Sequence, residues 1–336
     1  MLSKKKWRER AKLGKTLYRG CRVLLGVHGM EYGAQTEYGR LRKVLMHRPT
    51  EELKKITPGN KDAYLFRDVV YWKEFQREHD VYTDTLRSEG VDVILLEDLL
   101  DDRDEETAAR MPNLVYTRDV CSIPKPGALL LRMTYQARFP EPLLIGKAMA
   151  KLGISIALKI APPGVVEGGD FVYLDGETLM MGFGTRSNEA GVDMVRKLML
   201  GKTVKELVAV PLPSFRVHLD GALMVMAQDL AIFHKASLGL YPAYVYDEDG
   251  VDLVFLEDYL GEKGVELIYA DDTEVRVFGT NIVGLGDNKC VSYEWNERIM
   301  GELEERGFDC IGIPGSQLSI GGGGPHCMTC PILRDD

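Results

Sequence analysis

The sequence predicts a mixed α/β protein assembled from one repeated module. From Glu37 onward, segments with the period of an amphipathic helix alternate with short apolar runs typical of strands. One pattern, a helix followed by a glycine and then a strand, occurs five times, and no stretch rich in proline, glycine or serine divides the chain. Five similar modules indicate a closed, pseudo-symmetric ring in which strand ends meet at a central site. An ordinary doubly wound α/β sheet is the alternative, although no Gly-x-Gly-x-x-Gly motif follows the first strand.

The modules repeat the same signals in chain order. The first helix is expected at Phe75–Glu89, because Phe75, His79, Tyr82 and Leu86 recur at the spacing of one helix face. The glycine after each helix is the usual left-handed stop. The five units are Phe75–Glu89, Gly90 and Val91–Leu96; Leu144–Leu152, Gly153 and Ile154–Ile160; Glu189–Leu200, Gly201 and Val204–Val210; Leu256–Lys263, Gly264 and Val265–Tyr269; and Asn296–Arg306, Gly307 and Phe308–Ile313. Further strands are expected between them at Lys43–His47, Leu114–Thr117, Leu129–Met133, Phe171–Leu174, Leu223–Met226 and Val275–Phe278.

Composition and charge argue against several broad classes of protein. The chain has 336 residues, of which 45% are hydrophobic, enough to bury a large core. A net charge of −9 disfavours nucleic acid as the main partner but would attract a cationic substrate. Six scattered cysteines form no disulfide framework, so a cytoplasmic location is the simpler expectation. No apolar run is long enough to span a membrane.

The N-terminal stretch Met1–Arg19 is strongly basic and stands apart from the repeats. We therefore expect a basic extension over residues 1–33 and a single catalytic domain over residues 34–336. The extension is expected to be a solvated helix or a loose arm. A contact in a homo-oligomer is one open role for it.

A glycine-rich run near the C-terminus carries the first candidate for chemistry. Gly321–Gly324 lead through Pro325 to Cys327, and glycine lets the backbone approach a ligand closely. A cysteine there would act as a nucleophile through its thiolate. A plain structural loop is the main alternative. A phosphate loop would carry a lysine, a redox pair of Cys327 and Cys330 lacks room for its helix, and a zinc site lacks a second pair of ligands.

Three polar clusters stand where the apolar pattern predicts core residues. They are Arg118 and Asp119 after Leu114–Thr117, Glu167 and Asp170 around two glycines, and His218 and Asp220 around Leu219. A salt bridge or a solvated turn would explain either of the first two clusters. In a strand, the third cluster places His218 and Asp220 on one face, which suits acid/base chemistry.

Together these clusters offer one thiol, one histidine and several carboxylates, without metal-ligand spacing. A Cys–His–Asp peptidase would need one orienting acid, whereas this chain offers Asp119, Glu167, Asp170 and Asp220. A flat guanidinium pairs bidentately with carboxylates. The pattern therefore favours a small cationic guanidino substrate whose central carbon faces the sulfur.

The ordered motifs resemble the guanidino-group-modifying superfamily, which includes arginine deiminases, amidinotransferases and dimethylargininases. The similarity is broadest to arginine deiminase and covers about residues 34–334. It runs in the family's order through Thr36–Pro49, Leu53, Thr57–Pro58, Leu65–Asp68, Glu78–Asp80, Met111–Asp119, Glu167–Asp170, His218–Asp220 and Gly323–Met328. This resemblance implies a five-bladed pseudo-symmetric α/β propeller of ββαβ-type modules, the pentein fold.

The resemblance also implies a role for each matching residue. Cys327 would be the nucleophile, Asp119 and Asp220 would grip the guanidinium, and Glu167 and His218 would serve in binding and proton transfer. The implied substrate-binding residues are Asp119, Asp220, Arg186, Asn113, Asp170 and Arg118. The implied activity is hydrolysis of arginine or a related guanidino compound through a covalent thiouronium, releasing ammonia and a ureido product such as citrulline. No cofactor and no metal are implied.

Some features depart from the arginine deiminase pattern. The chain is too short for that family's inserted helical bundle, and Gly322 stands where the family carries an arginine that helps hold the substrate carboxylate. Arg186 matches another family arginine in that role, and Arg132 and Arg138 are further candidates. The ending His326–Cys330 is similar to that of glycine amidinotransferases, which typically lack the Glu-Gly-Gly-Asp motif. An amidinotransferase moving the amidino group to an acceptor amine is therefore the alternative, and a non-catalytic metal-binding protein is the third hypothesis.

Overall fold

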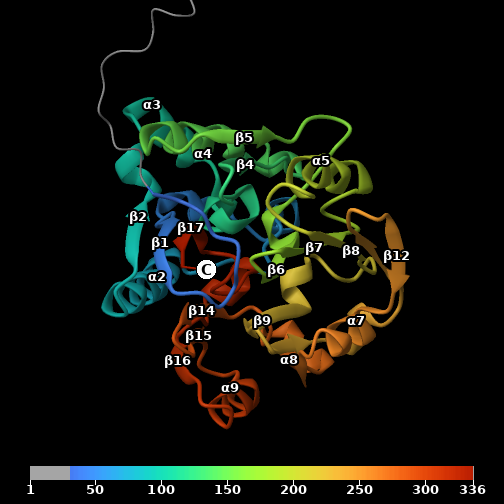
Figure 1. Ribbon diagram of the computed structural model, residues 1–336. Helices are drawn as coiled ribbons and strands as arrows, with labels where there is room; N and C mark the ends of the chain where they lie inside the picture. Colours follow the sequence, from blue (N-terminus) through green and yellow to red (C-terminus); the bar gives the residue numbers. More distant parts are fainter. Residues whose placement is uncertain (1–30, 336) are drawn as a thin grey trace, which may run out of the picture. The chain divides into compact units, whose positions relative to one another are not determined.

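The computed structural model describes residues 31–335, which contain five separate β-sheets with helices packed against them (Figure 1). The predicted basic stretch Met1–Arg19 lies outside the described residues, so the predictions made for it stay predictions. Mixed α/β architecture is confirmed.

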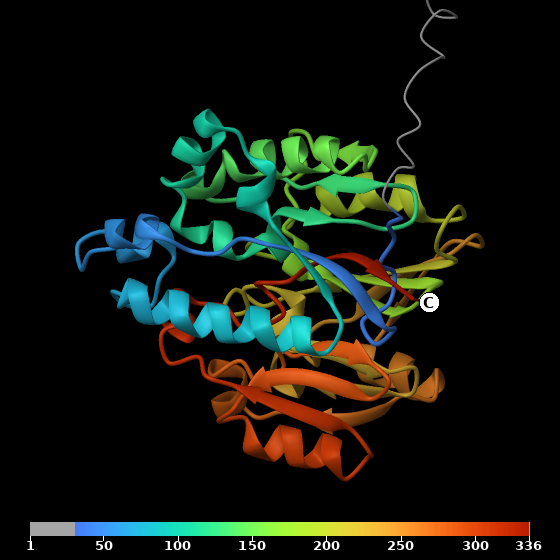
Figure 2. The same ribbon diagram turned by 90° about the vertical axis from the view of Figure 1, so that its left-hand side faces the viewer.

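All five sheets share one pattern, in which a central strand pairs antiparallel with one neighbour and parallel with the other. The antiparallel, central and parallel strands are β17 (Cys330–Arg334), β1 (Leu41–Met46) and β2 (Asp92–Leu95); β3 (Cys121–Ser122), β4 (Ala128–Leu130) and β5 (Ile156–Lys159); β6 (Phe171–Asp175), β7 (Thr178–Phe183) and β8 (Glu206–Pro211); β9 (Leu223–Ala227), β10 (Leu230–Phe233) and β13 (Glu266–Tyr269); and β14 (Val283–Gly286), β15 (Lys289–Tyr293) and β16 (Asp309–Ile313). Two more strands, β11 (Ala243–Tyr246) and β12 (Val251–Val254), extend the third sheet beyond β8. The first sheet takes its antiparallel strand from the C-terminal end of the chain, so that β1 and β17 lie side by side (Figure 2).

A helix lies in the crossover between the central and the parallel strand of each sheet. These helices are α2 (Trp72–Ser88), α4 (Glu141–Lys151), α5 (Glu189–Met199), α7 (Leu256–Glu262) and α9 (Glu297–Glu304), close to the predicted bounds. The glycines predicted to stop them have φ of +81° at Gly90, +72° at Gly153, +70° at Gly201, +78° at Gly264 and +85° at Gly307. The left-handed stop is therefore confirmed in every module. The other α-helices among residues 31–335 are α3 (Asp102–Ala108), α6 (Lys235–Leu238) and α8 (Asp272–Arg276).

Two expected strands are wrong, and each has a local reason. The run Leu114–Thr117 belongs to two short 3₁₀ turns, η4 (Pro112–Val115) and η5 (Thr117–Val120). Pro112 presets the first turn, and a buried apolar run of four residues does not distinguish a turn from a strand. Val275 lies in α8 instead, because Asp271 and Glu274 form a capping box at its start.

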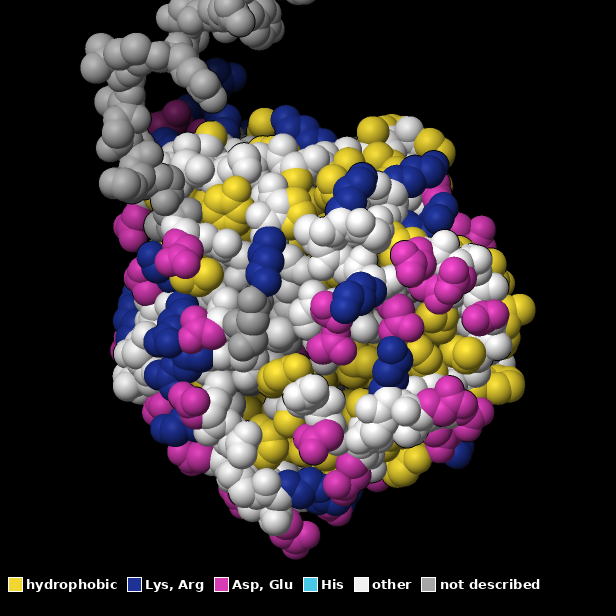
Figure 3. All heavy atoms as spheres, in the orientation of Figure 1, with side chains coloured by type: hydrophobic (Ala, Val, Ile, Leu, Met, Phe, Trp, Pro, Cys, Tyr) yellow, Lys and Arg dark blue, Asp and Glu magenta, His cyan; other side chains and the backbone are white. Residues whose placement is uncertain are grey.

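The helices and the surface charge each give one further finding. No helix among residues 31–335 is long and apolar enough to cross a membrane. On the face drawn in Figure 3, basic and acidic side chains are interspersed.

Candidate active site

The loop that carries Cys327 lies between η9 (Leu318–Gly321) and β17, and several elements fix its path. The Cys327 N–H donates to Asn281 Oδ1 (3.2 Å), and its carbonyl accepts from the Arg118 N–H (3.2 Å). Tyr293 donates its hydroxyl to the Gly323 carbonyl (2.9 Å). A Cβ on Gly323 would lie 2.4 Å from the Tyr116 ring, so only glycine allows this approach.

Asp119 reaches the same place from η5. The Thr117 hydroxyl pins this turn by donating to the Leu45 carbonyl (3.0 Å) and the Met328 carbonyl (3.1 Å). Asp119 Oδ2 accepts from Arg138 Nη1 (2.6 Å), whereas Oδ1 is buried and has no hydrogen-bond partner among residues 31–335. One carboxylate oxygen is therefore held in place while the other is free to accept.

The Glu-Gly-Gly-Asp motif brings Glu167 to the site on a loop that enters η7 (Gly168–Asp170). Glu167 Oε2 accepts from Arg186 Nη1 (2.7 Å) and lies 3.0 Å from His218 Nε2. The two glycines are required by close approach. A Cβ on Gly168 would lie 1.9 Å from the Arg118 carbonyl, and one on Gly169 would lie 2.5 Å from His218 Nδ1.

His218 and Asp220 are not on a strand, so the expected geometry is wrong. His218 immediately precedes the 3₁₀ turn η8 (Leu219–Gly221), and Asp170 Oδ1 holds that turn by accepting from the Leu219 N–H (3.0 Å). The turn still points both side chains at the site. Asp220 Oδ2 lies 3.8 Å from Cys327 Sγ.

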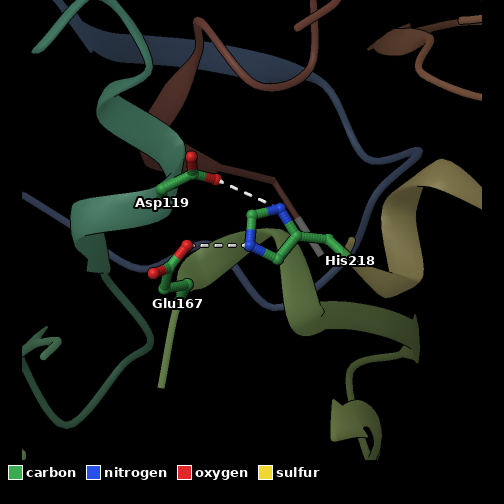
Figure 4. Close-up of side chains that lie close together, drawn as sticks. All are labelled: Asp119, Glu167 and His218. Carbon is green, nitrogen blue, oxygen red and sulfur yellow. Dashed lines mark hydrogen bonds and ion pairs between the residues drawn. The ribbon is translucent and has the colours of Figure 1, made fainter. Parts of the chain in front are cut away.

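His218 lies between two carboxylates, as Figure 4 shows. Its Nδ1 is 3.7 Å from Asp119 Oδ1, and its Nε2 faces Glu167. Burial alone would lower the pKa of His218, but the two carboxylates outweigh burial and raise this pKa to about 9. The imidazole is therefore held in its protonated form at neutral pH.

The thiol of Cys327, in contrast to the charged imidazolium, is held in its neutral form. Burial, followed by the nearby carboxylates of Asp220 and Asp119, raises the pKa of Cys327 well above its usual value. The sulfur is accordingly a protonated thiol at neutral pH.

Two residues of the buried centre were missed by the sequence reasoning. His326, next to the cysteine, places Nδ1 2.8 Å from Asp220 Oδ2 and Nε2 3.3 Å from Glu37 Oε2. Burial opposes the ionisation of Glu37, but Arg118 and His326 outweigh it and lower its pKa to about 2. In the sequence, Glu37 appeared only as part of Thr36–Pro49, the stretch that resembles the start of the arginine deiminase pattern. No local signal therefore distinguished it from an acid on the surface.

The arginines and the amide predicted to bind substrate are bound to protein groups. Arg118 pairs with Glu37 (2.9 Å) and donates to the Phe171 carbonyl (2.9 Å), so its guanidinium is held by the core. Arg186 pairs with Glu167, and its guanidinium lies 4.7 Å from the centre of the Tyr135 ring. Asn113 donates to the Tyr64 carbonyl (2.7 Å), while its Oδ1 is buried without a partner.

The two further arginine candidates, Arg132 and Arg138, differ in the groups that they bind. Arg132 Nη1 donates to the Gly164 carbonyl (3.2 Å). Arg138 is buried and pairs with both Asp119 and Glu141. Arg138 thus positions a site carboxylate.

A cavity of about 360 Å³ opens at Cys327. Its lining includes Cys327, His218 and Asp220, together with Arg67, Arg216, Arg276, Asn281, Gly322 and apolar side chains such as Phe215 and Phe278. The lining arginines come from three distant segments, and nothing in their local sequence indicated that they would meet here.

Metal binding has one candidate group among the described residues. Ligand atoms of Asp119, Glu167 and His218 all lie within 4.8 Å of one another. Arg138 and Arg186 already neutralise the two carboxylates, and a protonated imidazole offers no lone pair. Neither Cys327 nor Cys330 belongs to any such group within residues 31–335, and Cys330 Sγ lies instead 3.4 Å from the Cys121 carbonyl.

Comparison with protein families identifies the chain's relatives. The family model described as arginine deiminase matches residues 62–110 and 101–334. The arginine deiminase of Rhodococcus erythropolis (strain PR4) is 26% identical over 397 aligned positions, covering 90% of this chain and 97% of the relative. That of Mycobacterium marinum is 27% identical, covering 91% and 98%. Both alignments are longer than the 336 residues of the chain, so the relatives carry segments that it lacks, as its length indicated.

Comparison with solved structures supports the fold. A dimethylarginine dimethylaminohydrolase from Pseudomonas aeruginosa, a cysteine-to-serine variant complexed with citrulline, has a TM-score of 0.67 at 16% identity and covers 87% of this chain and 100% of its own. The N-terminal domain of the cyanobacterial arginine dihydrolase ArgZ, bound to product, has a TM-score of 0.68 at 15% identity and covers 87% and 97%. The fold, the order of the site motifs and the family match agree, and the chain belongs to the arginine deiminase family of guanidino-group hydrolases.

Proposed function

We propose that this protein hydrolyses arginine or a related guanidino compound, with Cys327 as the nucleophile. The observation that carries the proposal is the buried Oδ1 of Asp119, which accepts no hydrogen bond from residues 31–335 and has His218 Nδ1 only at the ion-pair distance of 3.7 Å. It lies in the same centre as Asp220 Oδ2, which is 3.8 Å from the sulfur. A buried acceptor without a donor is costly, and a guanidinium supplies N–H donors and a positive charge together.

The proposed reaction begins with substrate entry. A guanidinium between Asp119 and Asp220 offsets the negative charge that raises the pKa of Cys327, so the thiol can lose its proton to solvent water in the cavity that Cys327 lines. The thiolate then attacks the guanidino carbon. His218, which is held protonated, gives its proton to the departing amine, and ammonia leaves a covalent thiouronium.

Water completes the cycle. The now neutral His218 accepts a proton from water as its oxygen attacks the thiouronium carbon. Collapse of this adduct breaks the C–S bond, returns the thiol and releases the ureido product. With arginine as substrate, one water is consumed and citrulline and ammonia are formed.

We also infer that the five sheets are the blades of a closed propeller around this centre. Four apolar clusters each contain residues of two neighbouring sheets: one cluster includes Leu129 and Phe171, a second Val208 and Leu223, a third Met224 and Cys290, and a fourth Val291 and Val44. The contact of Cys330 in β17 with Cys121 in β3 links the remaining pair. A crystal structure with solvent separating any of these five pairs would contradict the ring. The proposed catalytic domain is residues 34–336.

Mass spectrometry of the products tests the function. Wild-type protein is incubated with arginine, alone and with glycine and lysine as acceptor amines, and Cys327→Ala serves as the control. Citrulline and ammonia without an acceptor are expected, and the variant should form neither while keeping the wild-type circular dichroism spectrum. Ornithine plus a new guanidino compound, formed only with an acceptor, would replace the hydrolase with the amidinotransferase suggested by His326–Cys330. Turnover by Cys327→Ala would refute both mechanisms.

A further inference from the structure

A pair of cysteines lies in the sheet of β14, β15 and β16, and neither of them lines the cavity at Cys327. Cys290 in the central strand β15 is the parallel register partner of Cys310 in the outer strand β16 (Figure 1). The two Sγ atoms are 3.4 Å apart, and neither thiol is in a disulfide. Neighbouring strands are about 4.8 Å apart, which falls within the Cα separation of roughly 4.4–6.8 Å that a disulfide spans. A disulfide here therefore needs no change of strand register.

The two thiols differ in exposure and in ionisation. Cys290 is fully buried in an apolar cluster that includes residues of α9, whereas Cys310 is half-buried because β16 is an outer strand. The Cys290 thiol donates to the Cys310 sulfur, and this hydrogen bond lowers the pKa of Cys310. The same hydrogen bond, together with burial, raises the pKa of Cys290 well above its usual value. The more accessible sulfur is therefore also the one with more thiolate character.

Two other roles for the pair fit the structure less well. A structural metal site needs further ligands, and no third histidine, cysteine or carboxylate within residues 31–335 joins the two thiols in a candidate group. Cys310 Sγ instead lies 3.6 Å from the Met300 carbonyl. Apolar packing accounts for Cys290, because a buried cysteine behaves as a small hydrophobic residue. It does not account for a second, half-buried thiol in contact with the first.

We propose that Cys290 and Cys310 form a peroxide-reactive dithiol, a modification site in which Cys310 reacts first and Cys290 completes the disulfide. The Cys310 thiolate attacks one oxygen of a hydroperoxide, the O–O bond breaks, and the other oxygen leaves and takes up a proton. The Cys290 sulfur then attacks the resulting Cys310 sulfenic acid, gives up its proton and forms the S–S bond as the S–O bond breaks and water leaves. The two thiols are oxidised by two electrons and the peroxide is reduced. With hydrogen peroxide, the products are one disulfide and two waters.

Peptide mapping by mass spectrometry tests the proposal on the full-length protein. Cys327→Ala removes the candidate nucleophile and Cys21→Ser removes a thiol outside the described residues, which leaves Cys121, Cys290, Cys310 and Cys330. The folded protein is treated with hydrogen peroxide, unfolded, alkylated with iodoacetamide and digested, with and without prior reduction by dithiothreitol. Cys121 and Cys330 are the matched control pair, because both side chains are fully buried and the Cys330 sulfur lies 3.4 Å from the Cys121 carbonyl.

The peptides that carry Cys290 and Cys310 should be joined, lighter than their sum by two hydrogens, and separated by dithiothreitol. Cys121 and Cys330 should remain alkylated. Cys310→Ser should abolish the link, and Cys290→Ser should leave a sulfenic acid on Cys310 that dimedone traps. Absence of the linked peptide, or a link between the control cysteines that forms equally fast, would overturn the proposal. The link itself is measured with both cysteines present, so a variant that fails to fold leaves this result intact.

Discussion

Replacing Glu167 by Gln should release His218 from its protonated state. The carboxylate lies 3.0 Å from His218 Nε2, and with Asp119 it raises the pKa of this histidine from 6.5 to about 9. That rise corresponds to about 3 kcal/mol of preferential stabilisation of the imidazolium. Removing one adjacent opposite charge shifts a pKa by about 1 to 3 units. Arg186, which bonds the same carboxylate oxygen, would then repel the imidazolium and favour the larger value.

The sign of the stability effect follows from the same pKa. A folded pKa of about 9 against an ordinary 6.5 contributes stability fully present below pH 6.5 and lost as pH rises through 9. Glu167→Gln should therefore lower the free energy of unfolding most at pH 6 and least above pH 9. At alkaline pH the difference between wild type and variant should narrow to the part caused by the lost ion pair with Arg186.

Histidine side-chain NMR gives the direct measurement. Because the chain contains few histidines, the one signal that is lost in His218→Gln can be assigned to His218. Glu52→Gln is the matched control, because Glu52 Oε1 lies 3.3 Å from His47 Nε2 in another buried pair. That control should lower the pKa of His47 and leave that of His218 alone. A His218 pKa unchanged in Glu167→Gln would refute the charge-pair argument.

Three further predictions concern the thiol, a site glycine and the loop support. Iodoacetamide labelling of Cys327, read by peptide mapping, should be slow in wild type near pH 8. It should be faster in Asp220→Asn at the same pH, because removing a nearby negative charge lowers the pKa of the thiol. Slower labelling in the variant would contradict the cause given for the raised pKa. Gly169→Ala should lose most activity while Gly176→Ala keeps it, because a Cβ at 169 meets His218 whereas one at 176 meets nothing within 4 Å; equal activities would contradict the close-approach argument. Glu78→Ala should destabilise the protein by about 3 kcal/mol in urea unfolding, because Ser316, Gln317 and Leu318 lose a buried ionic acceptor. Glu74→Ala, at a half-buried surface position on the same helix, should change stability little, and similar losses in both variants would show that the helix rather than the loop is affected.

The repeat was predictable from sequence because each module carries its own local signals. An amphipathic stripe, a glycine and an apolar run need no distant partner to be recognised, and α2, Gly90 and β2 lie where those signals placed them. The antiparallel pairing of β1 with the C-terminal β17 was not predictable in this way. Nothing within either strand specifies a partner almost a whole chain away.

In the candidate site too, features with a local signal in the sequence were predictable and features that depend on distant contacts were not. Its motif residues could be predicted because acids in apolar surroundings violate the local pattern, as Asp119 and Glu167 do. Their geometry could not, since the turn that carries Asp220 depends on a hydrogen bond from the Leu219 N–H to Asp170, which lies about fifty residues earlier in the chain. Arg67 carries no local anomaly, because an arginine in a loop is ordinary until the fold brings it to a cavity.

The charges of the buried centre explain why the acids that would bind substrate also keep the sulfur inert without it. Arg118 forms an ion pair with Glu37, and Arg186 forms one with Glu167. Arg138 pairs with Glu141 and with one oxygen of Asp119. Asp220 and the second oxygen of Asp119 are left facing histidines and the thiol. This local excess of negative charge raises the thiol pKa, and only a cation that donates hydrogen bonds in two directions relieves it. On the proposed mechanism, a neutral or anionic group in the same place would leave the thiol protonated, so the charge of the bound group would decide whether the Cys327 thiolate forms.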